Sequence, residues 1–184
     1  MELKAEQFKL FFPLPVTLIT TVDSNGVYNG APYSCVMPIL RPSNFIAIAS
    51  ALPRDTLRNI RETREFVVNV IGQPAFREAM LCAKSYPPGV DEMKEVGLET
   101  VPSRTVSPPR MKEALGWIES VLEHEVVGEN YSVVIGKVLS AEVNDAYWED
   151  GKLIEDPLVM LMPRFRTLGE KLAKGEDFRG KPGH

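Results

Sequence analysis

Two hydroxyl residues and one cation lie close together at the end of an apolar run. Ser50 ends the run, and Arg54 and Thr56 follow within six positions. They precede or begin a predicted helix over residues 57–64, and the first turn of a helix leaves backbone N–H groups that favour an anion. The spacing therefore predicts a phosphate site. From the residues alone, an equal alternative is that a hydroxyl or Asp55 caps the helix and that Arg54 is solvated.

Other reactive side chains are sparse. His124 and His184 are the two histidines, and neither belongs to a hydrolase or metal motif. Cys35 and Cys82 have no CxxC pattern, so we predict neither a zinc site nor a disulfide, and expect both to be small core residues of a reduced protein. The chain also lacks a P-loop and a GxGxxG fingerprint. Its chemistry would therefore come from a bound cofactor, and a flavin needs only a pocket, a phosphate clamp and backbone groups.

Length and composition indicate one globular domain. The 184 residues, 44% of them hydrophobic and 25% charged, suffice for a single core. The net charge of -4 and a pI of about 5.3 argue against nucleic acid and anionic membrane as partners. No apolar run approaches the roughly 18 residues of a membrane span, and residues 1–9 lack a signal-peptide core, so we expect a cytoplasmic protein.

Apolar patterning predicts a mainly β fold with short helices, either a barrel or a sandwich. A hairpin is predicted from the mostly β-branched residues 16–22, a turn over residues 23–26 and the extended residues 27–29. Further strands are predicted at residues 35–40, 45–50, 65–70, 117–127, 131–143 and 158–162, and short helices at residues 2–12, 57–64, 74–85 and 90–96. We expect one domain over residues 1–170 and a charged, mobile tail over residues 171–184.

Several segments carry more specific expectations. Residues 30–34 are predicted to be irregular or at a sheet edge, because Pro32 cannot donate a ladder hydrogen bond. The proline-rich residues 99–109 are predicted to form a surface connection and are a candidate lid. Alternation predicts that one set of residues shares a face of its strand, namely Val133, Ile135, Leu139, Ala141 and Val143. A solvated edge is predicted for Glu119, Glu123 and Glu125.

An ordered set of short segments resembles the flavin reductase-like, FMN-binding split-barrel family, which includes flavoredoxins. The segments are Pro15–Thr21, Asn29–Ser34, Ser50–Thr56, Asn59, Glu65–Asn69 and Ile135–Val138. They span about residues 8–168, and the ordered set is far more specific than any one motif. The resemblance implies a split β-barrel, a homodimer and FMN held non-covalently near the dimer interface, with FAD as an alternative flavin.

The resemblance also implies a set of cofactor contacts. The implied contacts are Asn29, Ala31, Pro32, Tyr33, Ser34, Ser50, Arg54, Asp55, Thr56, Asn69 and Arg164. Arg54 and the two hydroxyls would bind the phosphate, while Asp55 would cap the helix or contribute its backbone N–H. The segment from Asn29 to Ser34 would line the isoalloxazine ring, with small residues allowing close approach. Asn69 would be structural or contact the ribityl chain, and Arg164, beside Phe165, would reach the flavin.

For function, the resemblance implies a flavin reductase in which NAD(P)H passes hydride to flavin N5. The electrons would continue to a free flavin, an oxygenase partner, a metal complex or another redox protein. Tyr131 stands where many family members have a histidine associated with nicotinamide handling. This departure favours a second hypothesis, an FMN-binding electron-transfer protein without NAD(P)H turnover. The intact set of Ser50, Arg54 and Thr56 argues against a third hypothesis, a split barrel that has lost its flavin.

Overall fold

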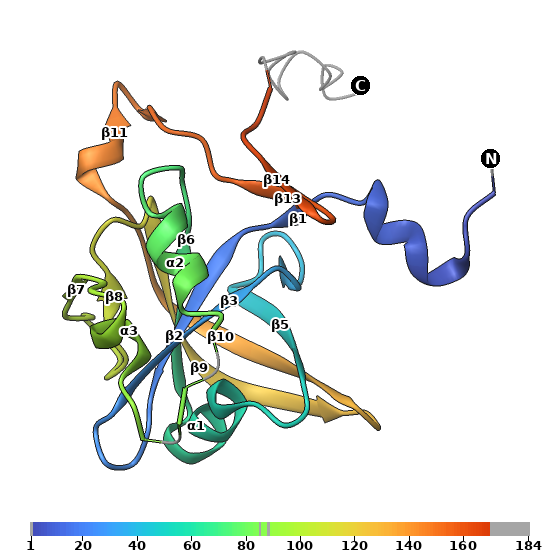
Figure 1. The fold of residues 1–184 in the computed structure, drawn as a ribbon. Coiled ribbons are helices and arrows are strands. Elements are labelled where there is room, and N and C mark those ends of the chain that lie inside the picture. Colours follow the sequence, from blue (N-terminus) through green and yellow to red (C-terminus); the bar gives the residue numbers. More distant parts are fainter. Residues whose placement is uncertain (1, 85, 88, 170–184) are drawn as a thin grey trace, which may run out of the picture.

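A curled sheet of seven antiparallel strands forms the body of the protein in a computed structural model, which describes residues 2–84, 86–87 and 89–169 (Figure 1). The strand order is β3-β2-β6-β9-β10-β5-β4. The strands are β2 (Thr17–Val22), β3 (Tyr28–Tyr33), β4 (Val36–Pro38), β5 (Phe45–Ala51), β6 (Glu65–Val70), β9 (Gly116–Val127) and β10 (Tyr131–Val143). The predicted mainly β fold is confirmed, and the predicted tail, residues 171–184, lies outside the described residues.

Short helices and small sheets surround this body. The helices are α1 (Asp55–Thr63), α2 (Phe76–Leu81) and α3 (Glu92–Glu95), with 3-10 turns η1 (Ala5–Leu10) and η2 (Asp145–Tyr147). The remaining strands are β1 (Leu14–Pro15), β7 (Thr100–Val101), β8 (Arg110–Met111), β11 (Trp148–Glu149), β12 (Lys152–Leu153), β13 (Val159–Leu161) and β14 (Arg164–Arg166). Strands β1, β13 and β14 form a separate sheet. Among the described residues, none of the helices has the length and apolar character needed to cross a bilayer.

The predicted hairpin is formed by β2 and β3. The Asp23 carboxylate accepts hydrogen bonds of 2.8 Å from the backbone N–H groups of Asn25 and Val27, and Gly26 takes a positive φ of 83°. Pro32 lies within β3 opposite Leu18, on the last strand of the sheet. An edge strand tolerates the missing N–H of a proline. The edge position is therefore confirmed, although the backbone there is regular strand and not irregular.

One apolar cluster fills the interior of the curl. Helix α1 closes it with Leu57 and Ile60, which pack with Phe66 of β6 and Val134 of β10. Gly136 leaves room for the Phe66 ring, because a Cβ there would lie 2.3 Å from Phe66 Cζ. The even-numbered side of β10 thus faces inward. The odd-numbered side that the periodicity grouped, from Val133 to Val143, is partly or fully exposed.

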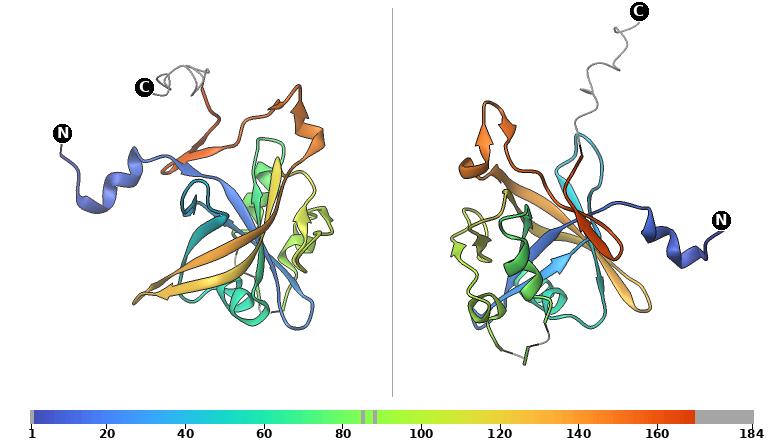
Figure 2. Two further views of the ribbon diagram at one scale, coloured as in Figure 1. Left: turned by 180° about the vertical axis from the view of Figure 1, so that it is seen from behind. Right: turned by 45° about the horizontal axis from the view of Figure 1, so that its top comes forward.

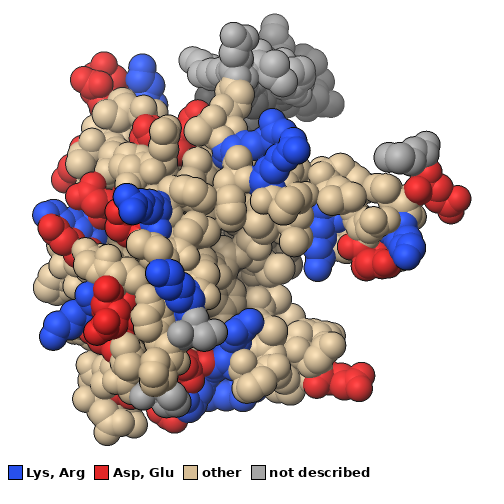
Figure 3. Space-filling view, in the orientation of Figure 1, with Lys and Arg blue, Asp and Glu red and all other residues tan. Residues whose placement is uncertain are grey.

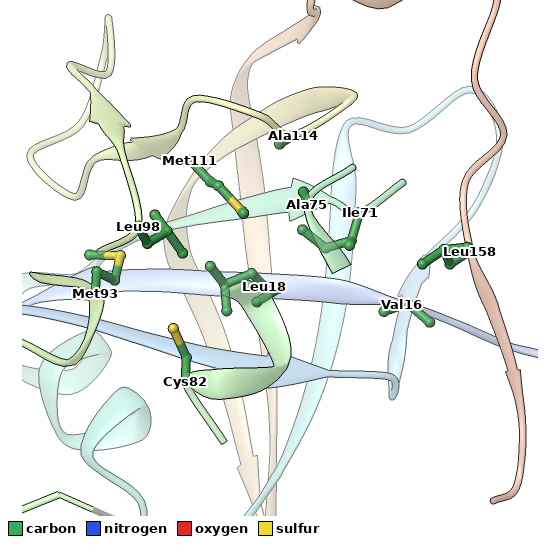
Figure 4. Close-up of a cluster of buried hydrophobic side chains, with 11 residues drawn as sticks. Val16, Leu18, Ile71, Ala75, Cys82, Met93, Leu98, Met111, Ala114 and Leu158 are labelled. Carbon is green, nitrogen blue, oxygen red and sulfur yellow. The ribbon is translucent and has the colours of Figure 1, made fainter. Parts of the chain in front are cut away.

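A second cluster covers the opposite side of β2, where α2 and α3 pack. In Figure 4 the sulfur-bearing side chains of Cys82, Met93 and Met111 lie around Leu18. The neighbouring residue Ile19 belongs to the interior cluster, so β2 is buried on both faces. A strand buried on both faces needs an uncharged residue at every position, and the mostly β-branched residues 16–22 meet this requirement.

The segment over residues 99–109 is held to the sheet by acidic side chains. Glu119 is fully buried, and its carboxylate accepts hydrogen bonds from the backbone N–H groups of Arg104 and Thr105 and from the Arg110 guanidinium at 2.6 Å. Arg110 also pairs with Glu142 at 2.7 Å. The prediction that Glu119 belongs to a solvated edge is therefore wrong, because this charge is compensated inside the protein.

The N-terminal segment projects away from the body as an arm (Figures 1 and 2). The predicted helix there is the 3-10 turn η1, and none of its residues is buried. Four large apolar residues of the arm are exposed, namely Phe8, Leu10, Phe11 and Phe12. The apolar face expected from the sequence thus has no covering partner among the described residues.

Candidate functional site

A cleft of about 590 Å³ opens where the two ends of the curled sheet approach each other. Its walls come from β3 and the residues after it, the end of β5, the start of α1 and the connection from α2 to α3. The lining residues predicted from the sequence are Asn29, Ala31, Pro32, Tyr33, Ser34, Ser50, Arg54, Asp55 and Thr56. The structure therefore brings together nine of the eleven predicted site residues.

The start of α1 gives the cleft its anion-binding character. The first hydrogen bond of this helix runs from the Arg58 N–H to the Arg54 carbonyl, so the N–H groups of Asp55, Thr56 and Leu57 have no partner within the helix. The Arg54 side chain makes no capping bond within the described part of the chain. A helix start of this kind favours a negatively charged group.

Arginines reinforce this positive character. One arginine, at position 54, directly precedes α1, and two more, at positions 58 and 61, lie within it; Figure 3 shows basic side chains together with acidic ones over this part of the molecule. Arg58 pairs with Asp55 at 2.6 Å, and Arg61 pairs with Glu125 at 2.7 Å. Among the described residues, Arg54 forms no ion pair and is exposed at the cleft. Of these three arginines, Arg54 is therefore the one that lines the cleft without an ion-pair partner in the described part of the chain.

The hydroxyl groups of the cleft are bonded to the walls. Thr56 Oγ1 donates to Asn29 Oδ1 at 3.0 Å, so its proton is not directed into the cleft. Ser50 Oγ donates to the Ala51 carbonyl at 3.1 Å and lies 2.8 Å from the Tyr33 hydroxyl. The latter bond joins β3 to β5, which are far apart in the strand order. These hydroxyls hold the walls of the cleft together. A bound anion would accept hydrogen bonds from Arg54 and from backbone N–H groups.

The amide of Asn29 is fixed at both ends. Its oxygen accepts the bond from Thr56, and its Nδ2 donates to Glu92 Oε2 of α3 at 2.8 Å. Glu92 is half-buried and lines the cleft. Burial, followed by the negative charges of Asp55 and Asp91, raises the pKa of Glu92 to about 7, while the N–H of Gly30 acts in the opposite direction. A carboxyl group that titrates near neutral pH therefore belongs to the cleft wall.

Gly30 lies against a helix. A Cβ at this position would lie 2.8 Å from Met93 Cγ. Met93 is 1% exposed and follows Glu92 in α3. Gly30 therefore makes room for α3 to pack against β3, and this packing places Glu92 at the cleft.

Several lining residues were not predicted. They are Cys35, Ala49, Ala51, Pro53, Arg58, Cys82, Ala83, Lys84, Tyr86 and Glu92. Cys35 is exposed, so its prediction as a core residue is wrong, whereas Cys82 is buried as predicted. Burial, followed by the charges of Glu92 and Asp91, raises the pKa of the Cys82 thiol to about 12. This thiol therefore stays protonated and is not a nucleophile.

Two predicted site residues lie away from the cleft. Asn69 is fully buried, and its amide donates to the Leu18 carbonyl at 2.9 Å and accepts from the Met111 N–H at 2.7 Å. It connects β2, β6 and β8 and has no path to a ligand. Arg164 is exposed on β14, beside Phe165. The centre of the Phe165 ring lies 4.8 Å from that of the Phe76 ring. Residues 99–109 do not line the cleft, so the candidate lid is not supported.

Comparison with known proteins identifies the family. The family model described as "Flavin reductase like domain" matches residues 9–169. The chain belongs to the flavin reductase-like family. A relative from Methanothermobacter thermautotrophicus, described as an uncharacterized protein, is 41% identical over 167 residues, covering 85% of this chain and 79% of the relative.

Solved structures of flavin reductase-like proteins share the fold. Component B of nitrilotriacetate monooxygenase from Bacillus cereus has a TM-score of 0.82 and 27% identity, over 94% of this chain and 95% of that one. Flavoredoxin of Desulfovibrio vulgaris (Miyazaki F) has a TM-score of 0.83 and 23% identity, over 95% and 97% of the two chains. The split-barrel fold inferred from the resemblance is confirmed, and the chain is a flavin-related oxidoreductase.

Proposed function

We propose that the protein binds FMN in the cleft and is an NAD(P)H-dependent flavin reductase. The carrying observation is that one cleft joins the open start of α1 and Arg54 to the β3 segment from Asn29 to Tyr33. A flavin mononucleotide presents a phosphate at one end and a flat ring at the other. These residues offer a matching anion site and a wall at a sheet edge.

The residues of the chain would act by binding and orientation. Arg54 and the N–H groups of Asp55 and Thr56 would hold the phosphate, and the half-buried segment after Asn29 would lie against the ring. The bonds of Asn29 to Thr56 and Glu92 would keep this wall in place. The flavin, when bound, would supply the hydride and electron transfer. The wall would keep bulk water from one side of the ring, and the chain would need to supply no side-chain acid for hydride transfer.

The first test is the visible absorption spectrum of the purified protein after incubation with excess FMN and desalting. We expect flavin absorption to remain with the protein, together with oxidation of NADH or NADPH when free FMN is supplied. Retained flavin without turnover by either nucleotide would leave the binding proposal intact and remove the reductase. Failure to bind FMN or FAD at any concentration tested would contradict both.

A second candidate is an FMN-binding electron-transfer protein without nicotinamide turnover. Tyr131 favours it, because this residue replaces the histidine that the family resemblance associates with nicotinamide handling. Tyr131 begins β10 and lies opposite Ala51, which lines the cleft. The Tyr131 ring lies against Gly128 and leaves no room there for a Cβ. In either case an oxygenase component or another redox protein is the proposed electron acceptor, since one structural relative is a monooxygenase component.

We also propose that the protein is a homodimer. Beyond the arm, exposed apolar side chains follow β4 and the tip of the β9–β10 hairpin, namely Met37, Ile39, Leu40, Val126, Val127 and Tyr131. Figure 3 shows a hollow between the arm and this tip, bordered mainly by uncharged residues. Exposed apolar side chains in such number are typical of protein interfaces.

Light scattering after size exclusion tests the dimer. We expect a mass of two chains of 20.5 kDa, and we expect Phe11→Asp to lower it toward one chain by placing a charge in the interface. Glu6→Gln, which changes charge on the same turn without removing an apolar group, serves as the control. A wild-type mass of one chain at micromolar concentration would contradict the proposal.

A further inference from the structure

Glu92 places a negative charge in the same cleft as the proposed phosphate site. Its carboxylate accepts a hydrogen bond from the Asn29 amide, and Asn29 accepts one from Thr56 in the first turn of α1. Two hydrogen bonds therefore connect the acid to the helix start. Asp55 lies in that turn and lines the cleft as well. A phosphate bound at the helix start would therefore share the cleft with two carboxyl groups, of which that of Glu92 is half-buried.

The two acids differ in how their charges are compensated. Asp55 has an ion pair with Arg58 at 2.6 Å. Glu92 has a neutral partner, the Asn29 amide, and no ion pair within the described residues. When an anion binds, the uncompensated carboxylate is the one that gains most by taking up a proton, because like charges in a partly buried site repel strongly.

The charged and titratable groups that line the cleft with Glu92 or lie close to it come from several segments. They are Arg54, Asp55 and Arg58 at the start of α1, Cys82, Lys84 and Tyr86 between α2 and α3, Asp91 just before α3, Asp23 of the β2–β3 turn, and Tyr28, Tyr33 and Cys35 of β3 and the residues after it. The Cys82 thiol and the Tyr86 phenol have raised pKa values and are neutral near pH 7. Lys84 is exposed, and Arg58 already pairs with Asp55. Glu92 differs from them in that burial and the charges of Asp55 and Asp91 raise its pKa to about 7.

We propose that the cleft takes up its anionic ligand together with a proton, and that Glu92 is the residue that binds this proton. The inference rests on the proposed function, because the anion is taken to be the flavin phosphate. The proton joins a carboxylate oxygen of Glu92 and comes from solvent. Glu92 is a positioning residue, since it acts on the ligand through Asn29 and through its charge.

The direction of the effect follows from linkage. The pKa of Glu92 is already about 7, and a bound phosphate raises it further, so the neutral acid binds FMN more tightly than the carboxylate does. Through Glu92 alone, FMN affinity is therefore greatest below pH 7 and falls as the pH rises through 7 and above. The phosphate itself acts in the opposite direction, because it gains its second charge near pH 6 and then attracts Arg54 more strongly. The contribution of Glu92 is isolated by comparing two proteins at each pH.

The test is a set of FMN dissociation constants for wild type and Glu92→Gln. The glutamine keeps an oxygen for the Asn29 amide and removes the titration. From about pH 6 to about pH 8.5, we expect the ratio of Kd, wild type over variant, to rise about tenfold, the value for one pKa unit of coupling. Riboflavin, which has no phosphate, should show little change in this ratio. Glu95→Gln, an exposed position on the same helix outside the cleft, should behave as wild type.

Proton uptake by the wild type gives a result that needs no variant. Isothermal titration at about pH 8, in two buffers of different ionisation enthalpy, should show uptake of about 0.4 proton per FMN and none per riboflavin, because one pKa unit of coupling moves the pKa of Glu92 from about 7 to about 8. A flat ratio of Kd and no proton uptake, with FMN still binding, would overturn this inference and leave the proposed function standing. Absence of FMN binding at every pH would overturn both.

Discussion

Arg54→Ala is expected to weaken FMN binding by about 1.5–3 kcal/mol, roughly 10- to 150-fold in Kd, the range for a hydrogen bond to a charged group. Arg54 is exposed at the cleft and, among the described residues, has no ion-pair partner in the free protein. Its charge is therefore available to the phosphate, and its loss removes the charged donor at the start of α1 while the backbone N–H groups remain. Fluorescence quenching of FMN measures the change.

Two comparisons separate a phosphate contact from a general loss of structure. Arg61→Ala, on the same helix, removes an arginine that pairs with Glu125 and does not line the cleft, so FMN affinity should stay near that of wild type. Riboflavin should bind wild type and Arg54→Ala almost equally, because it lacks the group that Arg54 recognises. If Arg54→Ala weakens both flavins to the same degree, the phosphate is bound elsewhere.

The largest effect on stability is expected for Arg110→Ala, which should lower the free energy of unfolding by about 3–5 kcal/mol. The Arg110 side chain is 5% exposed and pairs with Glu119, which is fully buried, and with Glu142. Its removal leaves a buried carboxylate that keeps its backbone donors but loses its counter-charge. Urea denaturation at neutral pH measures the loss.

The matched control is Arg104→Ala. Arg104 pairs with Glu142 at 3.1 Å, but its side chain is 72% exposed, so the loss should be about 0–1 kcal/mol. Adding Glu119→Gln to Arg110→Ala should restore part of the stability, since it removes the uncompensated charge. Equal losses for the two arginine variants would show that burial of the Arg110 pair contributes little.

Acid pH provides a further check on the same network. Burial acts to raise the pKa of Glu119, but the bonds from Thr105, Arg104 and Arg110 hold it below its usual value. The bond from Arg110 lowers the pKa of Glu142. An acid with a lowered folded-state pKa contributes stability above its usual pKa and loses it as the pH falls through the folded value. The difference between wild type and Arg110→Ala should therefore shrink below about pH 4.

Local sequence signals predicted the parts of the site that are continuous in the chain. Pro32 indicated an edge strand because it lacks an N–H, and β3 lies at the edge. The residues from Ser50 to Thr56 are close in sequence and therefore lie close together in the fold. The apolar pattern predicted that they join the end of a strand to the start of a helix, as β5 and α1 do. The family resemblance then extended the prediction to Asn29 and the residues after it.

The missed residues depend on packing between distant segments. Glu92 reaches the cleft because Met93 fits beside Gly30, more than sixty positions earlier, and no local pattern encodes that contact. The sequence leaves Asn69 with either a structural role or a ribityl contact, because a polar residue in an apolar strand has the same signature in both cases. The structure shows the structural role, since its amide binds backbone groups.

Periodicity has a similar limit. The solvated edge predicted for Glu119, Glu123 and Glu125 includes a buried acid, because alternation shows which residues share a face but not which face the rest of the chain covers. The same ambiguity affected β10, where the face that the alternation grouped is the outer one. Such assignments need the packing of the whole chain.

The contact between Arg110 and an aromatic ring gives the protein an optical reporter. The guanidinium carbon lies 5.0 Å from the centre of the Trp117 ring, and the indole N–H donates to the Met111 carbonyl at 2.8 Å. The chain has one other tryptophan, Trp148, which is 44% exposed. Emission from Trp117 therefore reports on the buried ion-pair network, and time-resolved fluorescence can follow its opening independently of events at the flavin cleft.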